Sequence, residues 1–150
     1  MTVTLAHSIK INASQQLVFK AATDWVRQNE WMLLTTVKPS YLDGRTAGGK
    51  IEAITGFMGI GFLDSMTITD WREPDLCRVI HTGKVVRGSG TFKVIKTNEA
   101  QSIFEWSEDV ILPFGMLGRL GWFVVRPIAK FGVVFSLKRF KKWVETDYKR

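Results

Sequence analysis

The chain has 150 residues, of which 45% are hydrophobic and 23% charged, so it can build one domain with a substantial core and does not have a disordered composition. Its net charge of +7 favours anionic partners, but no nucleic-acid-binding motif is present and we expect no nucleic-acid partner. The single cysteine, Cys77, excludes an intrachain disulfide and fits a reducing compartment, with its thiol buried as a small apolar group.

The first part of the chain predicts one strand and two short helices. Moderate alternation from Val3 to Ile11 indicates the strand. Ser14 is a typical N-cap, and the apolar residues after it predict a helix over Ser14–Thr23. A second short helical segment is expected over Trp25–Trp31. The N-terminus lacks the basic and apolar regions of a secretory signal.

The middle of the chain predicts consecutive strands joined by turns. Short turns between consecutive strands indicate an antiparallel meander, and glycines within strands suit bulges that curl a sheet. The glycine-rich segment Gly56–Gly61 has no Gly-Lys-Ser/Thr of a phosphate loop, so it is either a flap over a cavity mouth or an ordinary tight connection. The predicted strands are Ile51–Thr55, Phe62–Trp71, Leu76–Val86, Thr91–Lys96 and Ser102–Leu112.

After Pro113 the pattern predicts one long helix, which Pro127 should kink or interrupt. A long apolar-faced helix after a curled sheet is expected to pack into the concave side of that sheet. Three cations make a membrane span costly, so we expect a cytoplasmic protein. These cations are Arg119, Arg126 and Lys130, and the apolar stripe consists of Leu117, Leu120, Val124, Ile128, Phe131 and Phe135.

This order of elements resembles the helix-grip superfamily, also called SRPBCC or START-like, which includes polyketide cyclase/dehydrase and lipid-transport proteins. The resemblance covers essentially the whole chain, and it implies one α+β domain over residues 1–150 with about seven curved antiparallel strands around a long C-terminal helix. It also implies an internal cavity for an apolar or amphipathic small molecule and leaves the chemistry open. The segments that carry it are 9–19, 25–31, 62–71, 77–83, 106–108 and 112–113.

Strand alternation predicts that Asp64, His81 and Glu108 share the apolar faces of their strands. If those faces point inward, the three groups meet in one pocket, where a histidine beside a carboxylate is a plausible acid–base pair near neutral pH. In the alternative interpretation Glu108 pairs with an arginine and His81 bonds a backbone group, and one bulge would reverse the faces. The spacing of possible ligands does not indicate a metal site, and we expect no metal and no cofactor.

The leading functional hypothesis is binding of a lipid, polyketide or similar hydrophobic molecule. One alternative is an acid–base enzyme of the cyclase/dehydratase type that uses His81 with Glu108 or Asp64. Another is a peripheral lipid-transfer protein that meets an anionic membrane through its C-terminal basic cluster, Lys138, Arg139, Lys141 and Lys142, although such a run is usually a solvated face. The residues expected to line the cavity are Phe62, Met66, Val79, Phe92, Trp106, Leu120, Val124 and Ile128.

Overall fold

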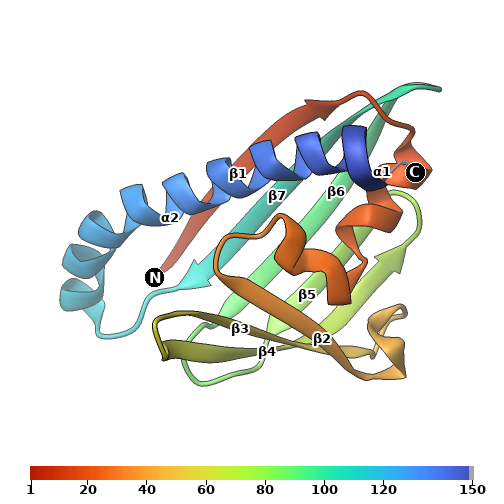
Figure 1. The fold of residues 1–150 in the computed structure, drawn as a ribbon. Coiled ribbons are helices and arrows are strands. Elements are labelled where there is room, and N and C mark those ends of the chain that lie inside the picture. Colours follow the sequence, from red (N-terminus) through yellow and green to blue (C-terminus); the bar gives the residue numbers. More distant parts are fainter. Residues whose placement is uncertain (149–150) are drawn as a thin grey trace.

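The computed structural model describes residues 1–148 and shows a curved seven-stranded antiparallel sheet with one long helix across its concave side (Figure 1). The spatial strand order is β1-β7-β6-β5-β4-β3-β2, so β2 to β7 form a meander and β1 closes against the last strand. The predicted α+β helix-grip architecture is confirmed. The strands are β1 (Thr2–Ile11), β2 (Thr35–Tyr41), β3 (Lys50–Phe57), β4 (Ile60–Arg72), β5 (Leu76–His81), β6 (Gly88–Asn98) and β7 (Gln101–Ile111).

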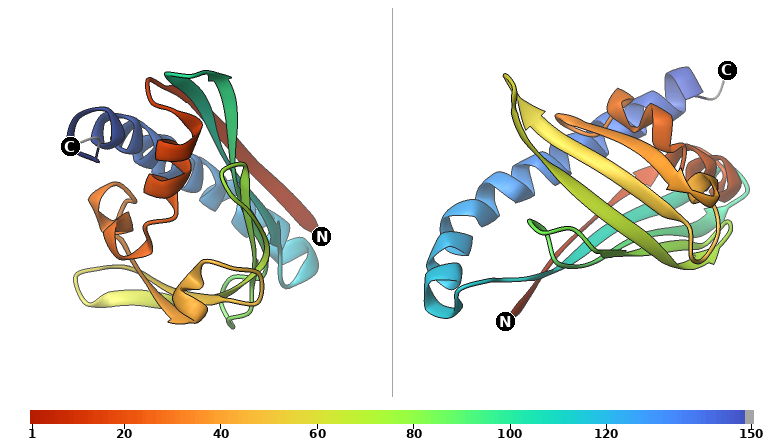
Figure 2. Two further views of the ribbon diagram at one scale, coloured as in Figure 1. Left: turned by 90° about the vertical axis from the view of Figure 1, so that its right-hand side faces the viewer. Right: turned by 90° about the horizontal axis from the view of Figure 1, so that it is seen from below.

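Two short helices follow β1, as predicted: α1 (Gln15–Ala22) and the 3-10 helix η1 (Trp25–Glu30). The hydroxyl of Ser14 accepts a hydrogen bond from the backbone N–H of Leu17 and caps α1. A 3-10 turn, η2 (Leu42–Gly44), follows β2. The long helix α2 (Gly115–Trp143) continues into a π-helical turn, η3 (Val144–Tyr148), and runs through Pro127 without interruption, although its first half bends (Figure 2).

The strands differ from the prediction in three places. The edge strand β2 was not singled out, because its short sequence contains Lys38 and Pro39 and shows little apolar alternation. β5 ends at His81, and the residues up to 87 form a loop. The glycine-rich segment is a tight connection, because β3 and β4 extend to Phe57 and Ile60 and only two turn residues with positive φ separate them.

Aromatic side chains fill the interior near α1 and the end of α2. The ring of Trp31 lies 4.6 Å from that of Phe140 between centroids, and Phe104 lies 4.7 Å from Phe140. These three side chains are at most 1% exposed. Cys77 is buried in the same core, as predicted, and burial raises the pKa of its thiol to about 12, so it stays protonated. The filled region occupies only part of the space between sheet and helix.

The second half of α2 is the part that packs on the sheet. Its buried residues begin at Val133 and include Phe140 and Trp143. Part of the predicted apolar stripe does not face the sheet, and for Leu117, Leu120 and Val124 this expectation was wrong, because they are 66–74% exposed. Ile128 of the same stripe does point into the space between sheet and helix. The face of α2 that points inward carries smaller residues, Ala129, Gly132, Val133 and Ser136.

Candidate functional site

A cavity of about 510 Å³ lies between the sheet and α2, beyond the aromatic core. Its walls are mostly apolar and come from the inner faces of β2 to β7, the segment around η1 and the inward face of α2. A volume of this size suits a drug-sized organic molecule. The lining side chains include Trp25, Met32, Val37, Ile51, Phe62, Met66, Val79, Phe92, Trp106, Val125, Ile128 and Val133.

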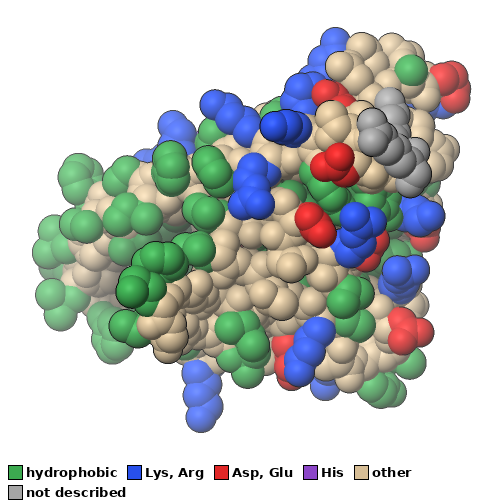
Figure 3. All heavy atoms as spheres, viewed as in Figure 1, with side chains coloured by type: hydrophobic (Ala, Val, Ile, Leu, Met, Phe, Trp, Pro, Cys, Tyr) green, Lys and Arg blue, Asp and Glu red, His purple; other side chains and the backbone are tan. Residues whose placement is uncertain are grey.

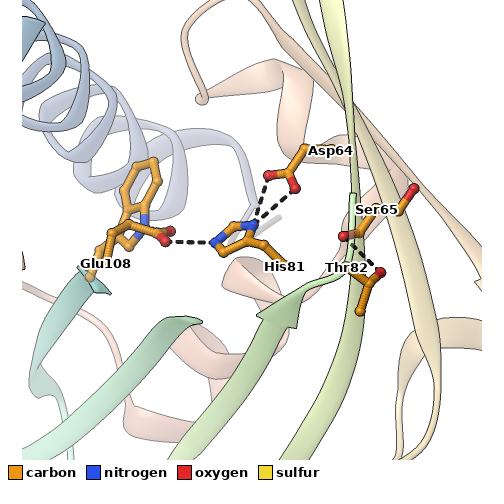
Figure 4. A network of polar contacts seen from close by, with 6 residues as sticks. Asp64, Ser65, His81, Thr82 and Glu108 are labelled. Carbon is orange, nitrogen blue, oxygen red and sulfur yellow. Dashed lines mark hydrogen bonds and ion pairs between the residues drawn. The ribbon is translucent and has the colours of Figure 1, made fainter. Parts of the chain in front are cut away.

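Three ionisable side chains meet in the wall of this cavity (Figure 4). The Nδ1 atom of His81, on β5, lies 2.9 Å from both carboxylate oxygens of Asp64 on β4. Its Nε2 atom lies 2.9 Å from the Oε2 atom of Glu108 on β7. Alternation along the strands brings the three groups to one face, as predicted, and the interpretation in which Glu108 pairs with an arginine is excluded. We call this group the buried triad.

Glu108 reaches His81 across β6 because the intervening residue is a glycine. Gly90 pairs with Glu108 in the sheet, and a Cβ atom at Gly90 would lie 2.8 Å from the Oε1 atom of that carboxylate. Trp106, two residues before Glu108 on the same face of β7, donates its indole N–H to Oε1 at 2.8 Å. The backbone of β6 and the indole therefore fix where the carboxylate lies.

The triad brings opposite charges together in a largely buried place. Burial alone lowers the pKa of His81, but its hydrogen bonds to Asp64 and Glu108 and the attraction of both carboxylates outweigh burial and raise that pKa to about 10. At neutral pH the imidazole is therefore a cation, and a cation between two carboxylates leaves one net negative charge in the wall. Glu108 is the most accessible member, with 22% of its side chain exposed against 4% for His81.

Several uncharged polar side chains of the wall are already bonded within the protein. The amide of Gln28 donates to the carbonyl of Ala22, and the hydroxyls of Thr35 and Thr55 lie 3.0 Å apart. No group of side chains within residues 1–148 is arranged to hold a metal ion. The buried triad supplies the charged side chains of the cavity wall.

The predicted lining residues separate by element. All five predicted on strands line the cavity, and so does Ile128 of α2. Leu120 and Val124 do not, because they lie on the opposite face of a helix whose first half extends beyond the core. Sequence reasoning missed the actual lining face of α2, which the small residues Ala129, Gly132 and Ser136, spaced at three and four positions, could have indicated.

The C-terminal basic cluster is not a uniform solvated face. Arg139 donates to the backbone carbonyl of Glu30 at 3.0 Å. Lys141 donates to the carbonyl of Lys10 and pairs with Glu145 at 2.7 Å. Half of the cluster therefore attaches the end of α2 to neighbouring segments.

Comparison with known proteins finds similar folds among solved structures. No protein-family model matches this chain, and no curated protein matches its sequence. Among solved structures, the Zhui aromatase/cyclase from Streptomyces sp. R1128 aligns with a TM-score of 0.78 at 12% identity, over 97% of this chain and 94% of that one. A norcoclaurine synthase from Thalictrum flavum, in complex with dopamine and hydroxybenzaldehyde, gives 0.69 at 12% identity, covering 98% and 88%.

A third similar structure, the Aha1 dimer from Colwellia psychrerythraea, aligns with a TM-score of 0.66 at 17% identity over 96% of this chain and 97% of that one. At these identities the likeness shows the fold and no more. The chain has the helix-grip fold that its sequence resemblance implied. What it binds must be argued from its own cavity.

Proposed function

We propose that this protein binds a hydrophobic or amphipathic small molecule in the cavity between the sheet and α2. The observation that carries the proposal is a space of about 510 Å³ with mostly apolar walls and one buried charged group in them. Apolar walls favour transfer of an apolar body from water, and a few fixed polar atoms orient it. The similar solved structures include an aromatase/cyclase and a synthase holding two small aromatic molecules, which supports the same use of the fold.

The triad restricts the polar part of the ligand. A carboxylate has about four acceptor sites, and Glu108 uses its two oxygens for Trp106 and His81 while part of its surface still faces the cavity. It therefore accepts a further hydrogen bond from a hydroxyl or an amine. An ionised acid would bring a second negative charge against the triad in a poorly screened site. The preferred ligand carries a donor group on an apolar body.

The test is binding of a neutral apolar dye, Nile red, followed by its displacement. Long-chain alcohols should displace the dye better than carboxylates of the same length, and Glu108→Gln should reduce that preference. Ala129→Leu should weaken dye binding by filling the cavity, whereas Ala100→Leu in the exposed β6–β7 turn should not. Dye binding that is unchanged by Ala129→Leu would place the dye elsewhere and overturn the proposal.

A second candidate, an acid–base enzyme, is favoured by the direct contacts of His81 with two carboxylates. Glu108 is the accessible carboxylate that would accept a proton from carbon and return it. The His81 cation, whose pKa is raised to about 10, holds that carboxylate in place through its Nε2–H. This function predicts exchange of hydrogen for deuterium at the carbon beside a carbonyl of a bound ketone.

The exchange is measured by mass spectrometry in deuterated water. Glu108→Gln should abolish the acceleration, and Glu105→Gln on the opposite face of β7 should keep it. Equal exchange with and without Glu108 would remove this candidate and leave the binding function intact.

A further inference from the structure

The first half of α2 has an apolar face that nothing within residues 1–148 covers. Its side chains recur at three- and four-residue spacing, so they share one side of the helix, and Ile128 at the edge of this face also lines the cavity. Phe123 is 84% exposed and Leu117 is 74% exposed. Figure 3 shows hydrophobic side chains gathered over this end of the molecule. The outer face consists of Leu117, Leu120, Phe123, Val124, Ile128 and Phe131.

A second exposed apolar element lies at the tip of the β3–β4 hairpin. Phe57, Met58 and Ile60 are 63–84% exposed. The cavity connects the two elements, because both Phe62 of β4 and Ile128 of α2 line it and both are exposed. We call the outer face of α2 and the hairpin tip together the apolar end. It borders the opening of the cavity.

The charges of the apolar end are all positive. The segments 56–63, 82–88 and 113–131 contain no Asp or Glu. On α2, Arg126 lies about two helical turns after Arg119, and Lys130 about three turns after it. The three cations therefore form a stripe beside the outer face. The loop before β6 adds Lys84 and Arg87, and the carbonyl of Arg87 accepts from the N–H of Ile111 just before α2.

A shallow groove on the same helix also combines apolar side chains with cations. It has a volume of about 350 Å³, and the ring of Phe131 stacks on that of Phe135 within it at 5.8 Å. Lys130 and Lys138 lie at its sides. Aromatic and aliphatic surface bordered by cations matches the boundary between acyl chains and anionic headgroups in a bilayer.

We propose that the apolar end docks on an anionic phospholipid bilayer, with the first half of α2 lying in the interfacial plane and the cavity opening onto lipid. This inference goes beyond ligand binding and does not depend on which molecule occupies the cavity. It also differs from docking through the C-terminal basic cluster, because the surface lies on the first half of α2 and on the hairpin.

Two other occupants are less consistent with the structure. The run Gly115–Tyr148 contains an 18-residue window with a mean hydropathy of 1.5, so by length and composition it could cross a bilayer. Crossing would remove Val133 and Leu137 from the core, where they are at most 8% exposed, and would place Arg126 and Lys130 in hydrocarbon. A second copy of the chain would bring the same all-positive surfaces face to face.

The experiment is co-sedimentation of the full chain with vesicles of phosphatidylcholine alone or mixed with phosphatidylglycerol. Binding is expected to the mixed vesicles and to weaken at high salt. Leu120→Gln with Phe123→Gln should reduce it about tenfold or more. Neutralising Arg119, Arg126 and Lys130 to Gln should reduce it about a hundredfold, since each cation contributes about fivefold.

Matched controls separate the surface from bulk properties. Lys20, Lys50 and Arg72, exposed cations on α1, β3 and β4, are changed to Gln with the same loss of charge. Val26→Gln with Ile95→Gln repeats the apolar change on other exposed positions. Both control variants should bind as the unchanged protein does, and all variants should keep the unfolding midpoint of the unchanged protein.

Three results would overturn the proposal. The first is no binding to anionic vesicles at low salt, and the second is equal loss in the control variants. The third is a vesicle-free dimer that Leu120→Gln with Phe123→Gln dissociates, which would make the apolar end a subunit interface. Nile red binding in lipid-free buffer tests the cavity separately, so failure of docking and failure of ligand binding are distinguishable.

Discussion

The two halves of α2 are both rich in large apolar side chains and have opposite surroundings. Phe140 in the second half is fully buried against three other rings, whereas Phe123 in the first half is 84% exposed. Apolar content alone therefore does not decide which part of a helix forms the core. The second half stabilises the fold, and the first half contributes to a wall of the cavity and leaves its outer face exposed.

The largest expected effect separates the two halves directly. Phe140→Ala should lower the free energy of unfolding by about 3–5 kcal/mol, because it leaves a cavity in the aromatic core. Leu120→Ala should change it by less than about 0.5 kcal/mol. Urea unfolding followed by circular dichroism measures both. Comparable losses for the two variants would mean that the first half of α2 is packed in solution.

The second-largest effect on stability is expected at the buried triad in the cavity wall. His81→Ala should cost about 3 kcal/mol, because Asp64 and Glu108 lose the cation that neutralises them. Combining it with Asp64→Asn and Glu108→Gln should recover much of the stability, since no buried charge then lacks a partner. A combined variant less stable than His81→Ala would show that the carboxylates stabilise the fold by other contacts.

The stability contributed by the triad should depend on pH with a definite sign. The pKa of His81 is raised from 6.5 to about 10 in the folded protein, so the folded state holds this proton more tightly than the unfolded chain. The contribution is complete below pH 6.5 and is lost as the pH rises to about 10. Urea unfolding across this range should show the decline, and His81→Ala should lack it.

The sequence predicts the sheet and its polar pocket better than the helix. Alternation of period two correctly placed Asp64, His81 and Glu108 on one face of the sheet. It could do so because the register of the strands is regular around these residues, and the irregularity of β4 lies beyond Ile68. The same reasoning could not reveal the contact of Glu108 with His81, which depends on Gly90 leaving space across a neighbouring strand. The helix α2 has two apolar faces, and the face with the larger side chains is the one exposed to solvent. The size of apolar side chains therefore pointed to the wrong face.

The smallest expected effect concerns the inward face of α2, which carries small residues. The hydroxyl of Ser136 accepts a hydrogen bond from the backbone N–H of Leu33 at 2.9 Å and joins the helix to the segment between η1 and β2. Ser136→Ala leaves this N–H without its partner and should cost about 1–2 kcal/mol. Ser8→Ala on the exposed side of β1 is the matched control and should cost less than about 0.5 kcal/mol.

Ser136→Ala also tests whether the hydrogen bond between Leu33 and Ser136 maintains the shape of the cavity. Leu33 and Ser136 both belong to its wall, so loosening their contact should weaken Nile red binding as well as stability. Hydrogen exchange at the Leu33 amide should rise in the variant, since the bond that protects it is gone. If exchange there is unchanged, another group holds this segment, and the second half of α2 contributes to the cavity by packing alone.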